Sequence, residues 1–199
     1  MIVEEAEMST QEKPRQRFTY GDYLGWPDEE RWEILEGEAY AMSPAPRPEH
    51  QRIVAEVIRQ IGNFLRGKPC RVYPAPFDVR FPLGDEADEE IDTVTGPDVS
   101  VICDETKLDD AGCRGAPDWV IEVLSPSTME RDIREKYHLY EKHGVREYWI
   151  VAPSDNTVIV HVLGDDGTFS PGARHGGSGR VAATVVKGLE IDLQQVFGE

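Results

Sequence analysis

DWVIEVL, at residues 118–124, is a short run in which five of the seven residues are apolar and three are β-branched. Residues of this kind favour strands, and a run that is apolar at successive positions is typical of a strand buried on both faces. Such a strand lies in the middle of a sheet that is covered on both sides. The segments around it should therefore supply partner strands and covering helices.

The segments after this run predict one long helix and further strands. Ser125-Pro126 leads into a helix whose N-cap is Ser127 or Thr128, and Gly144 ends it after about His143. The other C-terminal predictions are strands at 146–151 (REYWIV), 158–163 (VIVHVL) and 181–186, a glycine-rich loop at 164–179 and a short helix at 193–197.

The segments before the run predict a hairpin, two helices and two paired strands. Residues 32–42 (WEILEGEAYAM) are two strand-like runs joined at the turn pair Glu36-Gly37. The other predictions are a short helix from the cap Thr19 to Leu24, an amphipathic helix over 50–65, and paired strands at 71–81 and 98–103. Together they predict an α/β (α+β) domain over residues 18–199, with a mixed central sheet flanked by helices, an N-terminal hairpin and additional C-terminal strands. Residues 1–17 are expected to be a disordered tail.

The composition is that of a globular chain of one-domain size. Of the 199 residues, 39% are hydrophobic and 30% are charged, and no segment approaches the ~20 continuous apolar residues that a membrane span requires. The chain starts with acids where a secretory signal has a basic region, so we expect a cytoplasmic protein that binds no membrane. Cys70, Cys103 and Cys113 are an odd set without CxxC spacing, which indicates reduced thiols and no disulfide framework or zinc site.

The net charge of -17 argues against a nucleic-acid substrate, because affinity for a polyanion comes largely from Lys and Arg. The acids are concentrated in EEAE near the start, in residues 84–90 and at Asp109-Asp110, all of which are expected in loops. An uneven charge distribution, offset locally by divalent cations, keeps a nucleic-acid substrate compatible with this composition.

Two acids stand in otherwise apolar strands. Pro97-Asp98 opens one predicted strand, and Glu122 lies within the next. A buried ionised carboxylate is costly unless it is paired or binds a metal, and Mg²⁺ is usually held by one or two carboxylates plus waters and phosphate oxygens. The alternative is that Asp98 satisfies a turn and that Glu122 pairs with a buried Arg or Lys.

A second Pro-Asp pair, Pro117-Asp118, competes with Asp98 for this role. Asp118 and Glu122 share one face of a single strand, which places them ~13 Å apart at ~3.3 Å per residue. That separation is too large for one ion. Asp98 lies on a different strand that can run alongside, so Asp118 is expected to be a strand-start residue.

Three stretches resemble one known family, and they read GPDVSVI at 96–102, GAPDWVIEVLSPST at 115–128 and EKYHLYEKHGVREYWIVAP at 135–153. Together they resemble the Uma-type family of putative bacterial restriction endonucleases, and WEILEGEAYAMSP and PEHQRIV extend the resemblance over 18–163. The family belongs to the PD-(D/E)XK nuclease superfamily, whose pattern is Pro-Asp on one strand and Asp/Glu-x-Lys on the next. The resemblance implies a restriction-endonuclease-like fold in which Asp98 and Glu122 bind Mg²⁺, with Mn²⁺ as a substitute.

The chain departs from the superfamily pattern at Leu124, where lysine is expected. The resemblance implies that the lysine has moved to Lys136 on the following helix. A helix running back along the sheet places Lys136 ~12 Å along its axis. Glu122 lies ~7 Å from the end of its strand, and a lysine side chain can span the remaining gap. The alternative is that Lys136 only pairs with Asp132 at i, i+4 on a solvated face.

His50 and Glu38 are two further candidates. Helical spacing places His50 on the apolar face of its helix, so its side chain points inward. The resemblance implies a contact from His50 to metal-bound water or phosphate, and the alternative is a hydrogen-bonded core histidine. Glu38 is a candidate third acid, and its alternative is a solvated hairpin residue.

The resulting hypothesis is a Mg²⁺-dependent endonuclease that hydrolyses DNA phosphodiester bonds, with Lys136 serving the attacking water or the charge on the phosphate. Two alternatives remain open. A non-catalytic acidic protein on a nuclease scaffold would bind a basic protein partner, whereas a phosphodiesterase would use the same site on another substrate. A homodimer fits the nuclease hypothesis, because two copies of one site related by a two-fold axis can cut both strands.

Overall fold

The central sheet is mixed, as its sequence predicts. The computed structural model describes residues 16–27, 30–42, 46–126 and 129–198, so most of the tail expected at 1–17 lies outside the described residues. Within these ranges, the sheet has the strand order β12-β11-β10-β9-β6-β3. Strands β9 and β10 run parallel, and the other neighbours run antiparallel. The strands are β3 (Arg71–Pro74), β6 (Val99–Ile102), β9 (Trp119–Val123), β10 (Glu147–Ala152), β11 (Thr157–Val162) and β12 (Ala173–Gly176).

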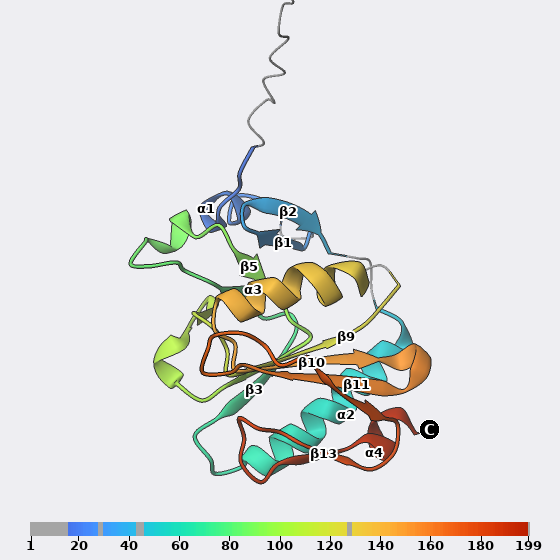
Figure 1. Cartoon of the computed structure of the whole chain (residues 1–199). Helices are drawn as coiled ribbons and strands as arrows, with labels where there is room; N and C mark the ends of the chain where they lie inside the picture. Colours follow the sequence, from blue (N-terminus) through green and yellow to red (C-terminus); the bar gives the residue numbers. More distant parts are fainter. Residues whose placement is uncertain (1–15, 28–29, 43–45, 127–128, 199) are drawn as a thin grey trace, which may run out of the picture.

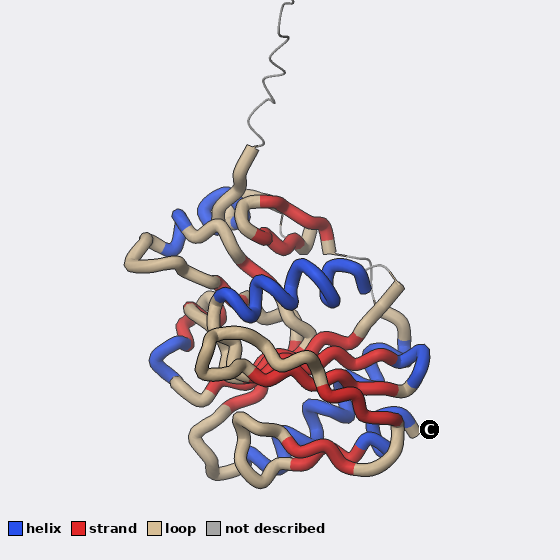
Figure 2. Tube along the Cα trace, viewed as in Figure 1, coloured by secondary structure: helices blue, strands red, loops and turns tan. Residues whose placement is uncertain are grey.

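Helices cover both faces of this sheet. Helix α2 (Pro48–Leu65) lies on one face, and α3 (Lys136–Lys142) lies on the other (Figures 1 and 2). One hydrophobic core forms between α2 and the sheet, and a second forms on the α3 side. The covering layers explain why the run at 118–124 is apolar at almost every position.

Alternate residues of β9 face the two cores, and every residue of the strand is buried. Ile121 packs in the core on the α2 side, whereas Val120 and Leu124 pack in the core on the α3 side. Because side chains alternate along a strand, Glu122 shares the face of Val120 and Leu124 and points toward α3. The alternation of side chains along β9 thus places the carboxyl group of Glu122 in the protein interior.

A second sheet lies beyond α3, so α3 is placed between two sheets (Figure 1). The predicted hairpin is confirmed as β1 and β2 of this sheet. The sheet itself is a correction, because the single strand expected at 71–81 is divided at Ala75-Pro76 into β3 of the central sheet and β4 of the second one. In the order β2-β1-β5-β4-β8-β7, its described strands are β1 (Trp32–Leu35), β2 (Glu38–Ala41), β4 (Val79–Arg80), β5 (Val94–Thr95), β7 (Leu108–Asp109) and β8 (Gly112–Arg114).

The two ends of the fold carry short elements. The predicted terminal helix is confirmed as α4 (Leu193–Phe197), and Thr19 caps α1 (Tyr20–Tyr23) as expected. Strand β13 (Arg180–Ala182) is shorter than predicted and pairs with β14 (Glu190–Asp192), which was not predicted. Strand β12 also corrects the sequence prediction, since it lies within the stretch expected to be a glycine-rich loop. The 3-10 segments are η1 (Asp88–Glu90), η2 (Glu105–Lys107) and η4 (Pro153–Asp155).

The helix predicted after β9 contains a π-helical segment that its sequence did not indicate. This segment is η3 (Arg131–Glu135), and the N–H of Lys136 donates to the carbonyl of Arg131, five residues earlier. The expected caps Ser127 and Thr128 lie outside the described residues. Single π-helical turns inside α-helices occur frequently at functional sites, and this one directly precedes Lys136.

Part of the acidity of the chain is used in internal ion pairs. The buried guanidinium of Arg80 pairs with Asp88 and Asp109, and Arg114 also contacts Asp88, at 2.7 Å. Two of the acidic stretches expected in loops therefore fold onto cations. Arg80 and Arg114, which are already counted in the net charge of -17, thus neutralise part of the negative charge of these two stretches.

A disulfide joins Cys70 and Cys103, which corrects the expectation of reduced thiols. Strands β3 and β6 pair with Arg71 opposite Ile102, so the next residue outward on each strand faces the other. The two cysteines are separated by 33 positions in the sequence, and only the strand pairing brings them together. Cys113 is free and buried.

Removing this disulfide is expected to destabilise the fold. The double variant Cys70→Ser, Cys103→Ser should lose about 2–4 kcal/mol of unfolding free energy, because the cross-link restricts the unfolded chain. Urea denaturation of the variant, and of the wild type with and without reductant, measures the loss. Identical urea midpoints in all three samples would show that the cross-link does not form.

Candidate active site

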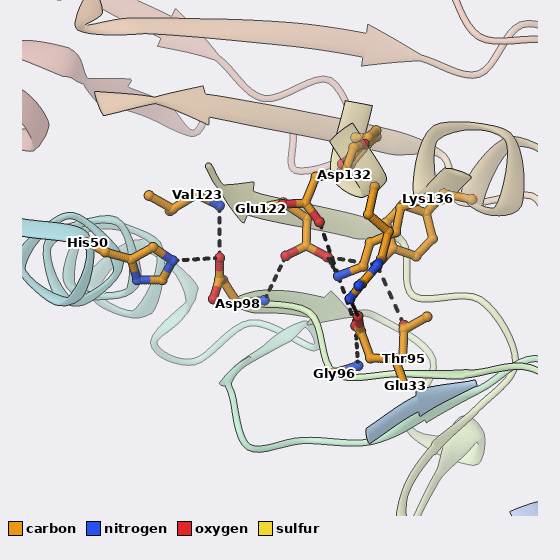
Figure 3. A network of polar contacts seen from close by, with 12 residues as sticks. Glu33, His50, Thr95, Gly96, Asp98, Glu122, Val123, Asp132 and Lys136 are labelled. Atoms are coloured by element: carbon orange, nitrogen blue, oxygen red, sulfur yellow. Dashed lines mark hydrogen bonds and ion pairs between the residues drawn. The ribbon is translucent and has the colours of Figure 1, made fainter. Parts of the chain in front are cut away.

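Asp98 and Glu122 lie directly across from each other on adjacent strands. Strand β6 pairs with β9 so that Val99 faces Ile121, and the next position outward brings Asp98 opposite Glu122. The backbone N–H of Asp98 donates to Oε2 of Glu122 at 3.3 Å, and the N–H of Val123 donates to Oδ2 of Asp98 at 2.8 Å (Figure 3). The two acids predicted from the apolar strands therefore share one site.

Lys136 reaches this pair from the helix above the sheet. Its side chain is 4% exposed, and its Nζ lies 2.8 Å from Oε1 of Glu122 (Figure 3). The alternative was that Lys136 only pairs with Asp132 on a solvated face. The pair exists, with Asp132 3.4 Å from Nζ, but both side chains are buried and the face is not solvated. The superfamily pattern has a lysine at the position of Leu124. Lys136 places its ammonium on the same face of the sheet as that position, because Leu124 and Glu122 both face α3.

Glu33 is the buried acid that the sequence reasoning missed. It lies on β1 and is 2% exposed, and its Oε1 is 2.8 Å from Nζ of Lys136. The N–H of Gly96 donates to the same oxygen at 3.1 Å, which ties β1 to the segment before Asp98. The signal was available in the sequence, because Glu33 interrupts the apolar run WEIL as Glu122 interrupts DWVIEVL.

The cluster contains more buried carboxylates than cations. Burial alone would lower the pKa of Lys136, but Glu122 and Glu33 outweigh it and raise that pKa well above its usual value. Burial, reinforced by Asp132 and Asp98, raises the pKa of Glu122 to about 8 although Lys136 opposes the shift. The hydroxyl of Tyr140 also donates to Oε1 of Glu122, at 2.9 Å. A site with this excess of negative charge is suited to a further cation.

His50 lies at the outer end of the same network. It sits in the first turn of α2, is 9% exposed, and its Nε2 is 3.1 Å from Oδ2 of Asp98 (Figure 3). Burial alone would lower the pKa of His50, but the contact with Asp98 outweighs it, so the pKa is raised. The structure therefore brings His50 together with Asp98, Glu122 and Lys136.

Glu38 and Asp118 lie apart from this cluster. Glu38 is exposed on β2 and accepts a hydrogen bond from the hydroxyl of Tyr40 at 2.9 Å, so the solvated-hairpin reading describes it better than that of a third acid. Asp118 accepts the N–H of Cys103 at 2.8 Å and pairs with Arg146 at 3.0 Å. This is the structural role expected for a strand-start residue.

The carboxylates at this site fit a magnesium ion. Asp98 is 22% exposed in its side chain, and among the described residues no group donates a hydrogen bond to its Oδ1. In the described ranges, no group of three or more His, Cys, Asp or Glu is placed to hold a metal ion. Mg²⁺ does not need such a group, because it is usually bound by one or two carboxylates and keeps several waters.

A carboxylate pair on adjacent strands, joined to a buried lysine and set in a mixed sheet between helices, defines a nuclease-like protein. The chain belongs to the Uma2 family, described as "Putative restriction endonuclease", whose profile matches residues 20–194. It is 27% identical over 151 residues to "Uncharacterized protein slr1290" of Synechocystis sp., which covers 74% of this chain and 75% of that protein.

The fold is similar to a crystal structure from Anabaena variabilis, described as that of a putative nuclease belonging to DUF820. The TM-score is 0.71 at 22% identity, and the match covers 90% of this chain and 97% of the other. The nuclease-like fold expected from the sequence is therefore confirmed. Within the described residues, every helix is too short or too polar to cross a membrane.

Proposed function

We propose that the protein is a metal-dependent endonuclease that hydrolyses phosphodiester bonds of DNA, with Mg²⁺ or Mn²⁺ held by Asp98 and Glu122. The observation that carries the proposal is the contact of the buried Lys136 ammonium with Glu122, directly beside Asp98. Neither a structural ion pair nor an isolated metal site requires all three groups together. Nuclease chemistry uses each of them.

Each residue has a role in this proposal. When bound, Mg²⁺ supplies the charge that polarises the scissile phosphate and lowers the pKa of a bound water. Asp98 keeps Oδ1, to which no described group donates a hydrogen bond, for the metal ion, and the Val123 N–H and His50 hold Oδ2 in place. Lys136 fixes the orientation of Glu122 and provides fixed positive charge close to where negative charge develops on the phosphate.

The proposal is tested by cleavage of a supercoiled plasmid, linear duplex, single-stranded DNA and RNA, each with Mg²⁺, with Mn²⁺ and with EDTA. Wild-type protein should cut DNA with either metal and not with EDTA. Asp98→Asn should fail to cut DNA even when Mg²⁺ or Mn²⁺ is present. Full cleavage by Asp98→Asn would contradict the site. If the protein cleaves none of these substrates and binds a basic protein tightly, the non-catalytic alternative is favoured. Sedimentation of the same sample tests the expected homodimer.

His50→Gln is expected to raise the Mg²⁺ concentration needed for half-maximal cleavage about 10–100-fold, because hydrogen-bonded partners of metal-binding carboxylates affect metal affinity by that amount. Cleavage rate against Mg²⁺ concentration measures the shift. Glu49→Gln is the matched control, since Glu49 is the exposed neighbour in the same helical turn. A histidine that served only packing would lower stability and leave the half-maximal Mg²⁺ concentration unchanged.

A further inference from the structure

A cavity of about 480 Å³ opens beside the segment that carries Asp98. Gly96, two residues before Asp98, lines it, and so does Ala75, whose N–H donates to the backbone carbonyl of Asp98 at 3.1 Å. The side chain of Met42 packs against Gly96 and forms part of the same wall. The cavity is therefore continuous with the backbone of the candidate site, and its volume lies within the range of small-molecule pockets.

Three aromatic rings line the cavity, and each contacts a neighbouring ring. Tyr23 and Trp26 line the cavity and contact each other edge to face, with ring centroids 5.7 Å apart. Phe77 also lines it and stacks on the ring of Tyr73, with ring centroids 4.5 Å apart. All three lining rings are only partly buried, so their surfaces remain available to a flat ligand.

A carboxylate without a partner stands in this aromatic wall. Asp78 lines the cavity and is half-buried, and among the described residues nothing donates a hydrogen bond or forms an ion pair with its side chain. Burial raises the pKa of Asp78, and the nearby charges of Arg80 and Arg31 offset this only in part. Neither oxygen of Asp78 is among the buried polar atoms that lack a partner, so both reach solvent in the cavity. Donors from a ligand can replace water at these oxygens.

We infer that this cavity binds an unpaired nucleobase of the substrate, with a preference for guanine, next to the phosphate held at Asp98 and Glu122. The inference rests on the proposed function and narrows its substrate class to DNA with an unpaired nucleotide beside the cut. Every base has a flat face that can stack on aromatic rings, so this part of the binding does not depend on sequence. The preference comes from Asp78.

The two oxygens of a carboxylate accept hydrogen bonds only. Guanine presents two adjacent donors, N1–H and the N2 amino group, on its Watson–Crick edge, so Asp78 can accept both at once. Thymine presents one N–H between two carbonyls, which repel a carboxylate. That edge is buried in a base pair, so the base must be unpaired to use it. Arg31 lines the cavity together with the acids Glu30, Asp109 and Asp110, and it supplies a cation for the polyanionic strand.

Calorimetric titration of the full chain with dGMP and with dTMP, without divalent metal, tests the inference. Wild-type protein should bind dGMP at least tenfold more tightly than dTMP. Asp78→Asn should remove that preference, and Trp26→Leu should weaken binding of both nucleotides. Asp85→Asn, a change of the same kind on an exposed loop outside the cavity, should leave both affinities unchanged. Equal affinities for the two nucleotides, the same preference in Asp78→Asn, or no saturable binding of dGMP would overturn the inference.

A cleavage assay separates this inference from the proposed function. With Mg²⁺, a duplex carrying one unpaired guanine should be cut faster than the fully paired duplex, and Asp78→Asn should reduce the difference. Preferred binding of dGMP without cleavage of any DNA would support the cavity and contradict the nuclease proposal. Equal cleavage of both duplexes by wild type and Asp78→Asn would contradict the role of the cavity and retain the nuclease.

Discussion

Glu122→Gln is expected to abolish metal-dependent cleavage, because glutamine keeps the shape of Glu122 but offers Mg²⁺ no charged oxygen. Wild type and variant are compared on one DNA substrate over a range of Mg²⁺ concentrations. Glu38→Gln is the matched control, since Glu38 is exposed on the hairpin, and it should cleave as wild type does. Cleavage by Glu122→Gln at the wild-type rate would remove Glu122 from the site.

The same variant should change how stability depends on pH in metal-free protein. Burial raises the pKa of Glu122 from 4.5 to about 8. Between these values the folded protein keeps a proton that the unfolded chain has lost. The folded state therefore binds more protons, and the free energy of unfolding falls as pH rises from about 4.5 to about 8. Glu122→Gln lacks this titration and should lose less stability over that range.

Urea denaturation at pH 5 and at pH 8, in EDTA, measures the difference. Wild type should lose on the order of a few kcal/mol more than Glu122→Gln, since each unit of pKa shift corresponds to about 1.4 kcal/mol. The raised pKa of His50 contributes a loss of the same sign, present in both proteins. At pH 8, adding Mg²⁺ should raise the melting temperature of wild type and leave that of Glu122→Gln unchanged. Equal pH dependence in both proteins would show that Glu122 is ionised throughout.

The elements nearest the site could be predicted from the sequence because their signals are local. The apolar run at 118–124, the helical spacing of apolar residues over 50–65 and the turn pair Glu36-Gly37 each indicate one element, and the structure contains all three. Lys136 was predicted from the resemblance. Its helix, α3, packs on the face of the sheet that carries Glu122, and its Nζ lies 2.8 Å from Glu122, which agrees with that prediction. The role of each residue in catalysis stays a prediction.

The remaining features depend on contacts between distant segments. Glu33 enters the cluster only because the second sheet places β1 over α3, and that sheet is built from strands of two to four residues with little periodicity. The candidate third acid chosen from the sequence was Glu38, although the buried acid, Glu33, lies on the other strand of the same hairpin. The Cys70–Cys103 bond likewise follows from strand pairing and not from spacing.

Lys136→Met is expected to abolish cleavage and to destabilise the protein by about 3–5 kcal/mol, because removing one partner of a buried ion pair leaves the other charges uncompensated. Lys136 is the shared cation of Glu33, Glu122 and Asp132, so its loss leaves three buried carboxylates without it. Urea denaturation and the cleavage assay measure the two effects. Lys142→Met is the control, since Lys142 lies on the same helix but is 48% exposed, and its ion pair should contribute little.

A second substitution separates the structural role of this lysine from its role in catalysis. Adding Glu33→Gln to Lys136→Met removes one of the uncompensated charges, so the double variant should regain part of the lost stability. Glu33 contacts the ammonium of Lys136 and the N–H of Gly96, and its substitution returns no positive charge to the site. Cleavage should therefore stay absent in the double variant even where urea denaturation shows it to be folded. If stability and cleavage return together, Lys136 only supports the cluster, and the charge that stabilises the reacting phosphate comes from another group.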